Sequence, residues 1–222
     1  VKQTEETHDT ITFIELEDEV GSLAKNLALD LKQMILSKEF KLYYQPQYNN
    51  KDICIGVEAL LRWKHPTYGM IYPPLVIKLA EELNMITTLE KIIIEKVFED
   101  APQLIDAIGE NAKISVNVTV ATLQTEGFEE FLQQKIKNID LQKASICLEI
   151  TEQMALRTDT DVENLLTRIR QMGYKLAIDD FSMGHTSLKY LQASQFDIVK
   201  LDGSIVKAML NNSRSKEIIA SI

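Results

Sequence analysis

Short β-branched runs alternate with longer helical patterns along most of the chain, and this alternation is the strongest constraint on its fold. The runs that predict strands are Lys41–Gln45, Ile53–Leu60, Lys113–Val118, Ser145–Ile150, Lys175–Asp179 and Asp197–Leu201. The stretches that predict helices are Leu23–Leu36, Leu75–Leu83, Leu89–Ile108, Leu123–Ile136, Asp161–Met172 and His185–Gln192. Strands that alternate with helices in this way are typical of a parallel α/β sheet.

The length and composition allow one large hydrophobic core. The 222 residues are 45% hydrophobic and 26% charged, which excludes collagen-like, low-complexity and largely disordered chains. No apolar run approaches the roughly 20 residues needed to cross a bilayer, and the N-terminal residues lack the apolar segment of a signal peptide. We therefore expect a cytoplasmic domain without a membrane segment.

The net charge of −9 argues against binding to a nucleic-acid polymer, because the lysines and arginines are few and scattered. An anionic substrate therefore needs local cations. The two cysteines, Cys54 and Cys147, lie inside apolar runs. This placement favours buried thiols over a disulfide or a zinc site.

The two ends of the chain do not fit the alternation. Residues 1–21 are acidic and Thr-rich, so we interpret them as a linker or N-terminal arm, and residues 22–222 as the barrel domain. A closed barrel of parallel strands needs about eight strands. Ser213–Ile222 predicts a helix with no strand after it. We therefore expect a C-terminally incomplete barrel that is truncated before its last two strands.

Most of the predicted strands carry an acidic or amide residue at or near the C-terminal end. These residues, with the one lysine among them, are Glu58, Asn117, Glu149, Asp179, Asp180, Lys200 and Asp202. The carboxyl ends of the strands in a parallel barrel meet at one rim, where active sites are built. Any one of these carboxylates alone is more often a structural partner, but several at one rim repel one another unless a cation compensates. We therefore expect a cation at this rim.

Oxygen ligands without converging His or Cys suit Mg²⁺, Mn²⁺ or Ca²⁺ better than Zn²⁺. The pair Asp179–Asp180 suits two ions, because one carboxylate can bridge ions roughly 3.5–4 Å apart. Such a site can activate water and stabilise a phosphodiester transition state. Lys200 is either a counter-ion of Asp202 or Glu149, or a direct participant that orients water or phosphate. Arg62 is either a phosphate clamp or a structural partner.

The order of these motifs resembles the EAL-domain family of cyclic di-GMP phosphodiesterases. The matching segments are Gln45-Pro46, Glu58 to Trp63 (EALLRW), Val116-Asn117, Leu148 to Glu152 (LEITE), Asp179 to Phe181 (DDF) and Lys200 to Asp202 (KLD). The resemblance covers Ala28 to about Val206. It implies a modified (β/α)8 TIM-type barrel with an antiparallel first strand, and hydrolysis of cyclic di-GMP to linear pGpG. It also implies a bacterial homodimer with an upstream sensor or cyclase domain.

The resemblance also implies a role for each site residue. The metal ligands are Glu58, Asn117, Glu149, Asp179 and Asp180, which hold Mg²⁺ or Mn²⁺, as two ions in a complete domain. Lys200 and Glu58 are catalytic. The substrate contacts are Gln45, Leu60, Arg62 and Asp202, and Glu152 stabilises the loop that follows its strand.

The chain departs from the family pattern in two places. Ser182 begins the run Ser-Met-Gly-His where the family usually has Gly-Thr-Gly-Tyr, so it lacks the conformational freedom of glycine. A later glutamate, which completes the family's second metal site, and a late glutamine have no counterpart before Ile222. Two alternative hypotheses are an inactive EAL-type receptor of cyclic di-GMP and an unrelated metal-dependent barrel enzyme acting on sugar phosphates.

Overall fold

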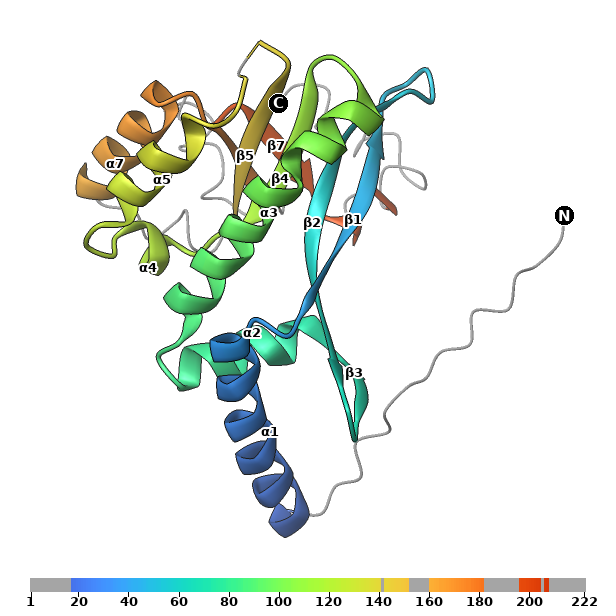
Figure 1. The fold of residues 1–222 in the computed structure, drawn as a ribbon, viewed down its shortest axis with the longest axis vertical. Helices are drawn as coiled ribbons and strands as arrows, with labels where there is room; N and C mark the ends of the chain where they lie inside the picture. The colour runs from blue at the N-terminus through green and yellow to red at the C-terminus, as the bar shows by residue number, and fades with distance from the viewer. Residues whose placement is uncertain (1–16, 141, 152–159, 182–195, 205, 208–222) are drawn as a thin grey trace, which may run out of the picture.

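A computed structural model describes residues 17–140, 142–151, 160–181, 196–204 and 206–207. The helices in these ranges are α1 (Glu17–Ser37), α2 (Pro73–Glu82), α3 (Ile86–Ile108), α4 (Val120–Leu123), α5 (Phe128–Ile136) and α7 (Thr160–Gln171). The strands are β1 (Lys41–Tyr48), β2 (Cys54–His65), β3 (Gly69–Ile71), β4 (Ala112–Asn117), β5 (Ala144–Thr151), β6 (Lys175–Phe181) and β7 (Ile198–Leu201). Figure 1 shows a twisted sheet with α3, α5 and α7 along one side.

The strands form one sheet in the order β1-β2-β4-β5-β6-β7, with β3 paired to β2. β1 and β3 are antiparallel to β2, whereas β2, β4, β5, β6 and β7 run parallel to one another. This confirms the predicted α/β fold with an antiparallel first strand. Within the described residues β1 and β7 are the two edges, so the barrel is not closed there.

The hydrophobic core lies between the sheet and the helices. β4 and β5 are buried over almost their whole length, because both faces of a parallel strand are covered in this class of fold. Ile114 and Leu148 from these strands belong to the same buried cluster as Ile94 of α3 and Leu166 of α7. Packing in this core fixes the position of each parallel strand along the sheet, and therefore where its carboxyl end lies.

Gly56 sets how closely β2 approaches β4. A Cβ atom at this position would lie 2.4 Å from the carbonyl oxygen of Lys113, which no real side chain tolerates. The absence of a side chain therefore allows the pairing of Gly56 with Lys113 and, two residues on, of Glu58 with Ser115. Glu58 is thereby placed at the carboxyl end of the parallel sheet.

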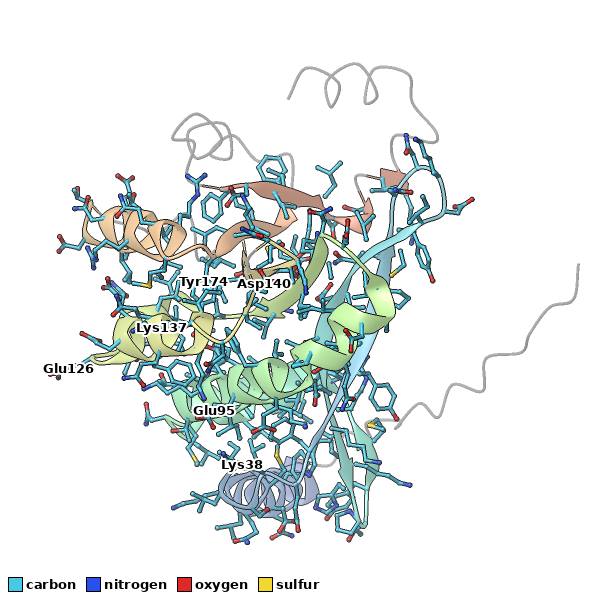
Figure 2. The ribbon with its side chains drawn as sticks, turned by 45° about the horizontal axis from the view of Figure 1, so that its top comes forward. Lys38, Glu95, Glu126, Lys137, Asp140 and Tyr174 are labelled. Atoms are coloured by element: carbon cyan, nitrogen blue, oxygen red, sulfur yellow. The ribbon has the colours of Figure 1, made fainter. Side chains whose placement is uncertain are left out.

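Away from that end, charged side chains connect the helices. The ammonium of Lys38 donates to Glu95 of α3 at 3.0 Å, and Lys135 of α5 donates to the same carboxylate at 3.3 Å. Figure 2 labels Lys38 and Glu95 where α1 and α3 meet. Lys38 has φ of 57°, the left-handed conformation in which helices commonly end.

Several element boundaries differ from the sequence prediction. The first helix begins at Glu17 and not at Leu23. The helix predicted over Leu123–Ile136 is divided into α4 and α5, because Gly127 takes a left-handed φ of 76° immediately before α5. The hairpin of β2 with β3 was not predicted. In the β2 segment Trp63 to His65, buried residues alternate with exposed ones, but Arg62, Lys64 and His65 are basic, so the sequence does not show the apolar alternation that predicts a strand.

Other predictions concern single residues or lie outside the described structure. Pro73 begins α2, where proline suits the first turn of a helix, and Gly173 follows α7 with a φ of 103°. Both cysteines are free, and Cys147 is fully buried whereas Cys54 is half-buried. No helix in the described ranges combines the length and apolar character of a membrane span. The stretches predicted as helices at His185–Gln192 and Ser213–Ile222 fall outside the described residues.

Candidate active site

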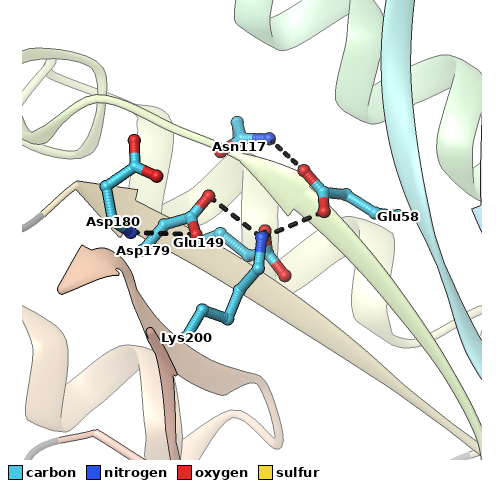
Figure 3. Close-up of polar contacts among 6 residues, drawn as sticks. All are labelled: Glu58, Asn117, Glu149, Asp179, Asp180 and Lys200. Carbon is cyan, nitrogen blue, oxygen red and sulfur yellow. Dashed lines mark hydrogen bonds and ion pairs between the residues drawn. The ribbon is translucent and has the colours of Figure 1, made fainter. Parts of the chain in front are cut away.

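Three carboxylates from three strands meet at the carboxyl end of the sheet. Glu58 of β2, Glu149 of β5 and Asp179 of β6 each offer one oxygen, and these oxygens lie within 4.8 Å of one another. We call these three residues the carboxylate cluster. The parallel register brings them together, because Thr151 at the end of β5 pairs with Asp179 while Glu149 pairs with Asn117 of β4. The convergence predicted from the sequence is therefore observed (Figure 3).

The ammonium of Lys200, from β7, lies among the three carboxylates (Figure 3). It donates to Glu58 Oε2 and to Asp179 Oδ2, each at 2.9 Å, and to Glu149 Oε2. Burial alone lowers the pKa of Lys200, but these carboxylates raise it above its usual value. Lys200 is therefore a cation at neutral pH and has no lone pair with which to accept a proton.

Glu149 is the most deeply buried member of the carboxylate cluster, with 1% of its surface exposed. Burial is the main cause that raises its pKa; the ammonium of Lys200 opposes this effect and the carboxylate of Glu58 adds to it. The second oxygen, Oε1, is buried and has no hydrogen bond of normal geometry among the described residues, although the Ser115 hydroxyl lies close enough to lower the pKa of this carboxyl. A buried acceptor without a partner is costly, so this oxygen fits a further cation.

Asn117 adds an amide to the same rim. Its Nδ2 donates to Glu58 Oε1 at 3.1 Å, so the amide orients the carboxylate from the side opposite Lys200. Together the carboxylates of Glu58, Glu149 and Asp179 carry a formal charge of −3, and Lys200 returns +1, which leaves −2. All the ligand atoms in the carboxylate cluster are oxygens. This donor set and its uncompensated charge fit a hard divalent cation such as Mg²⁺, Mn²⁺ or Ca²⁺.

Asp180 is adjacent to the carboxylate cluster but does not join it. Its backbone φ of 54° is left-handed, its N–H donates to Asp179 Oδ1 at 3.0 Å, and its carboxylate points away from Lys200 in Figure 3. The left-handed backbone at Asp180 interrupts the regular strand, at the point where the pairing of β6 with β7 also shifts register, and this is why Asp179 and Asp180 diverge. Burial, followed by the neighbouring Asp179, raises the pKa of Asp180.

The predicted substrate contacts on β1 and β2 share one face of the hairpin. Gln45 is paired with Glu58 across the strands, and Leu60 and Arg62 follow Glu58 at intervals of two residues. The guanidinium of Arg62 lies 5.6 Å from the ring centre of Tyr43 and donates to the Leu61 carbonyl at 2.9 Å. Arg62 is thus held on the sheet surface, separate from the carboxylate cluster.

A cavity of about 430 Å³ connects these two regions. Leu60, Arg62, Asn117 and Glu149 line it from the sheet. Pro73, Pro74, Ile77 and Lys78 of α2 contribute to its opposite wall. The cavity is mostly apolar with a few polar groups, which is typical of small-molecule sites.

Two other predicted residues lie elsewhere. Asp202 accepts hydrogen bonds from the backbone N–H of Ser204 at 2.8 Å and from its hydroxyl, and these contacts lower the pKa of Asp202. Of the two counter-ions considered for Lys200, the structure shows contact with Glu149, and the carboxylate of Asp202 is engaged in its own turn. Glu152 falls outside the described residues.

Sequence reasoning missed two residues near the site. Tyr43 precedes Gln45 by two positions and lies opposite Leu60, so strand alternation alone indicates that it faces the site. Glu90 of α3 lines the cavity and is buried. Its signal is an acidic residue on a helix face that also presents Ile93, Ile94 and Val97, the spacing of a buried stripe.

A model of the family described as EAL domain matches residues 28–222. The chain belongs to the EAL-domain family. This EAL chain is 31% identical over 205 residues to an uncharacterised protein of Mycobacterium tuberculosis, covering 91% of the chain and 33% of that protein. It is 30% identical over 181 residues to the probable cyclic di-GMP phosphodiesterase PdeN of Escherichia coli, covering 81% of the chain and 35% of PdeN.

Solved structures give the same family. The PaMucR phosphodiesterase in its complex with cyclic di-GMP superimposes with a TM-score of 0.77 at 27% identity, covering 89% of the EAL chain and 80% of that structure. The EAL chain spans about a third of the length of the two sequence relatives described above.

Proposed function

We propose that this EAL domain hydrolyses cyclic di-GMP to linear pGpG with Mg²⁺ or Mn²⁺. The observation that carries the proposal is the meeting of Glu58, Glu149 and Asp179 around Lys200 in a chain of this family. Its relative PdeN is named a probable cyclic di-GMP phosphodiesterase, and the similar PaMucR structure holds cyclic di-GMP. We place the domain in the bacterial cytoplasm, as a homodimer with an upstream sensor or cyclase domain.

The ion has a defined set of proposed ligands. Glu58, Asn117, Glu149 and Asp179 would hold it, and Asp180 is assigned to a second ion. A bound divalent ion supplies Lewis-acid stabilisation of a phosphoryl oxygen and lowers the pKa of a water molecule. The buried Oε1 of Glu149, which has no hydrogen-bond partner among the described residues, supports the assignment.

The chemical step forms one bond and breaks another. The oxygen of water bonds to phosphorus, the bond from phosphorus to the ribose 3′ oxygen breaks, and that oxygen takes up a proton from solvent, while the proton accepted by Glu58 returns to solvent. The product is a linear dinucleotide with a 5′ phosphate and a free 3′ hydroxyl. The carboxylate of Glu58 accepts the proton of water, whereas the ammonium of Lys200 donates a hydrogen bond to the phosphoryl group as its negative charge grows.

Substrate binding is assigned to the β1–β2 face and to the turn after β7. A strand rises roughly 3.3 Å per residue, so Arg62 lies about 13 Å along β2 from Glu58. A dinucleotide with one phosphate at the carboxylate cluster therefore extends toward Arg62. Gln45 contacts it beside Glu58, Leu60 contacts it between Glu58 and Arg62, and Asp202 contacts it at the far edge of the site.

The test is turnover of cyclic di-GMP by a purified protein that carries this domain together with the late glutamate of the second metal site. We expect a single product that co-elutes with pGpG in the presence of Mn²⁺ or Mg²⁺, and no turnover in EDTA. Tight binding of cyclic di-GMP with no turnover in either metal would favour the receptor hypothesis. Equal binding of mononucleotides and cyclic di-GMP would exclude both.

A further inference from the structure

Glu90 is a buried carboxylate that has no part in the proposed chemistry. It lies on α3 with 4% of its surface exposed. Both of its oxygens accept from the backbone N–H of Thr119, at 3.1 and 3.0 Å, and Oε2 also accepts from the Thr119 hydroxyl at 3.0 Å. These partners are neutral, and the ion pairs found among the described residues do not include Glu90.

A buried carboxylate without a cationic partner is costly, and a leucine or methionine at this position would pack at lower cost. Burial raises the pKa of Glu90 to about 7, although the hydrogen bonds from Thr122 and Thr119 lower it. Because a buried acid at this position is costly, we look for its role in the backbone segment that it hydrogen-bonds.

That segment is the turn that leaves β4. Thr119 is the N-cap residue of α4, and its hydroxyl accepts from the Thr122 N–H at 3.2 Å. The preceding residue, Val118, donates its N–H to the carbonyl oxygen of Glu149 at 2.9 Å. The turn is therefore held on one side by β5 and on the other side by Glu90. Asn117, the ligand that orients Glu58, is two residues from this second anchor.

We propose that Glu90 is a positioning residue of the active site, which holds Thr119 so that the Asn117 amide points at Glu58 and at the bound ion. This inference rests on the proposed function, because Asn117 is a metal ligand only under that function. The contacts between Glu90 and Thr119 do not depend on it. Hydrogen bonds from three donor groups hold the turn within two residues of Asn117. The Val118 N–H donates to the Glu149 carbonyl, and the N–H and the hydroxyl of Thr119 donate to Glu90.

The first test is Mn²⁺ affinity without substrate, measured by electron paramagnetic resonance on the whole 222-residue protein. We expect Glu90→Ala to weaken Mn²⁺ binding by about 10- to 100-fold, the range found when groups that orient metal ligands are removed. Glu90→Gln keeps an acceptor for the Thr119 N–H, so it should retain affinity to within about threefold. The matched control is Val97→Ala, a buried residue two turns further along α3, which should lose stability but not Mn²⁺ affinity.

The second test needs no metal. The side-chain amide resonances of Asn117 in the metal-free protein should move toward their random-coil positions in Glu90→Ala, but not in Glu90→Gln or Val97→Ala. A folded Glu90→Ala protein with wild-type Asn117 resonances and wild-type Mn²⁺ affinity would overturn the proposal. If Glu90→Ala does not fold, Thr119→Ala decides by the same two readouts, because it removes the hydroxyl contact and leaves the carboxylate.

The two proposals fail in different ways. If the wild-type protein binds Mn²⁺ but leaves cyclic di-GMP intact, the phosphodiesterase assignment fails and the Mn²⁺ affinities still decide the role of Glu90. If the wild-type protein does not bind Mn²⁺, the Asn117 resonances decide it alone.

Discussion

Lys200→Met tests the electrostatic balance of the site most severely. The substitution keeps a side chain of similar length and removes the cation from among three carboxylates. At an effective dielectric constant of 20, unit charges about 4 Å apart attract by about 4 kcal/mol, so three such pairs reach about 12 kcal/mol before desolvation. Desolvation of Lys200 and of the buried Glu149 opposes most of this. Removing one partner of a buried pair costs about 3–5 kcal/mol, and we expect that loss in the metal-free protein.

The assay is urea unfolding in EDTA and in excess Mn²⁺. Because the variant leaves three carboxylates with no lysine among them, Mn²⁺ should restore more stability to Lys200→Met than it adds to the wild type. The control is Lys135→Met: the Lys135 side chain is exposed to a degree similar to that of Lys200, 28% against 24%, but its ammonium pairs with a single carboxylate. This control should lose less than about 1 kcal/mol, with no dependence on Mn²⁺. A Lys200→Met protein that loses no more than the control in EDTA would refute the reasoning.

Three further predictions concern single residues. Glu58→Ala should reduce turnover at least about 100-fold while circular dichroism shows an intact fold, and wild-type turnover in that variant would remove Glu58 from the site. Arg62→Ala should raise KM and the dissociation constant of cyclic di-GMP with little change in kcat, whereas an unchanged KM would remove Arg62 from substrate binding. Because the folded pKa of Glu90 is raised to about 7, its contribution to stability is present below pH 4.5 and is lost as pH rises to about 7. Glu90→Gln should therefore gain about 3 kcal/mol over the wild type between pH 4 and pH 8, and urea unfolding of both proteins with parallel pH profiles would contradict this.

The strand pattern was sufficient to predict much of the fold and the meeting of the acids. Parallel strands that end in Glu58, Glu149 and Asp179 must bring these residues to one edge, so their convergence follows from alternation and strand direction. The antiparallel first strand required the family resemblance, because the run Lys41–Gln45 has no feature that gives its direction. The β2–β3 hairpin was missed because its buried residues are not consistently apolar and its exposed residues are not consistently polar, so the sequence shows no clear alternation.

The finer geometry of the site depends on contacts between residues far apart in the chain. Asp180 was expected beside Asp179, but its left-handed backbone directs it outward, and the sequence does not encode that angle in any local signal. Glu90 was missed because a lone acid in an apolar helix gives no indication of its partner, which here lies 29 residues away. The position of Lys200 among all three carboxylates likewise needed the register of five strands.

The central claim is that Glu58, Glu149 and Asp179 hold a divalent cation. Anomalous diffraction from crystals grown with Mn²⁺ tests it most directly, because the signal locates the ion without reference to activity. We predict a peak at the carboxylate cluster, beside the Lys200 ammonium and at roughly 2.0–2.3 Å from Oε1 of Glu149, the oxygen that does not face Lys200. A peak elsewhere on the protein, or none at this position in crystals saturated with Mn²⁺, would contradict the account.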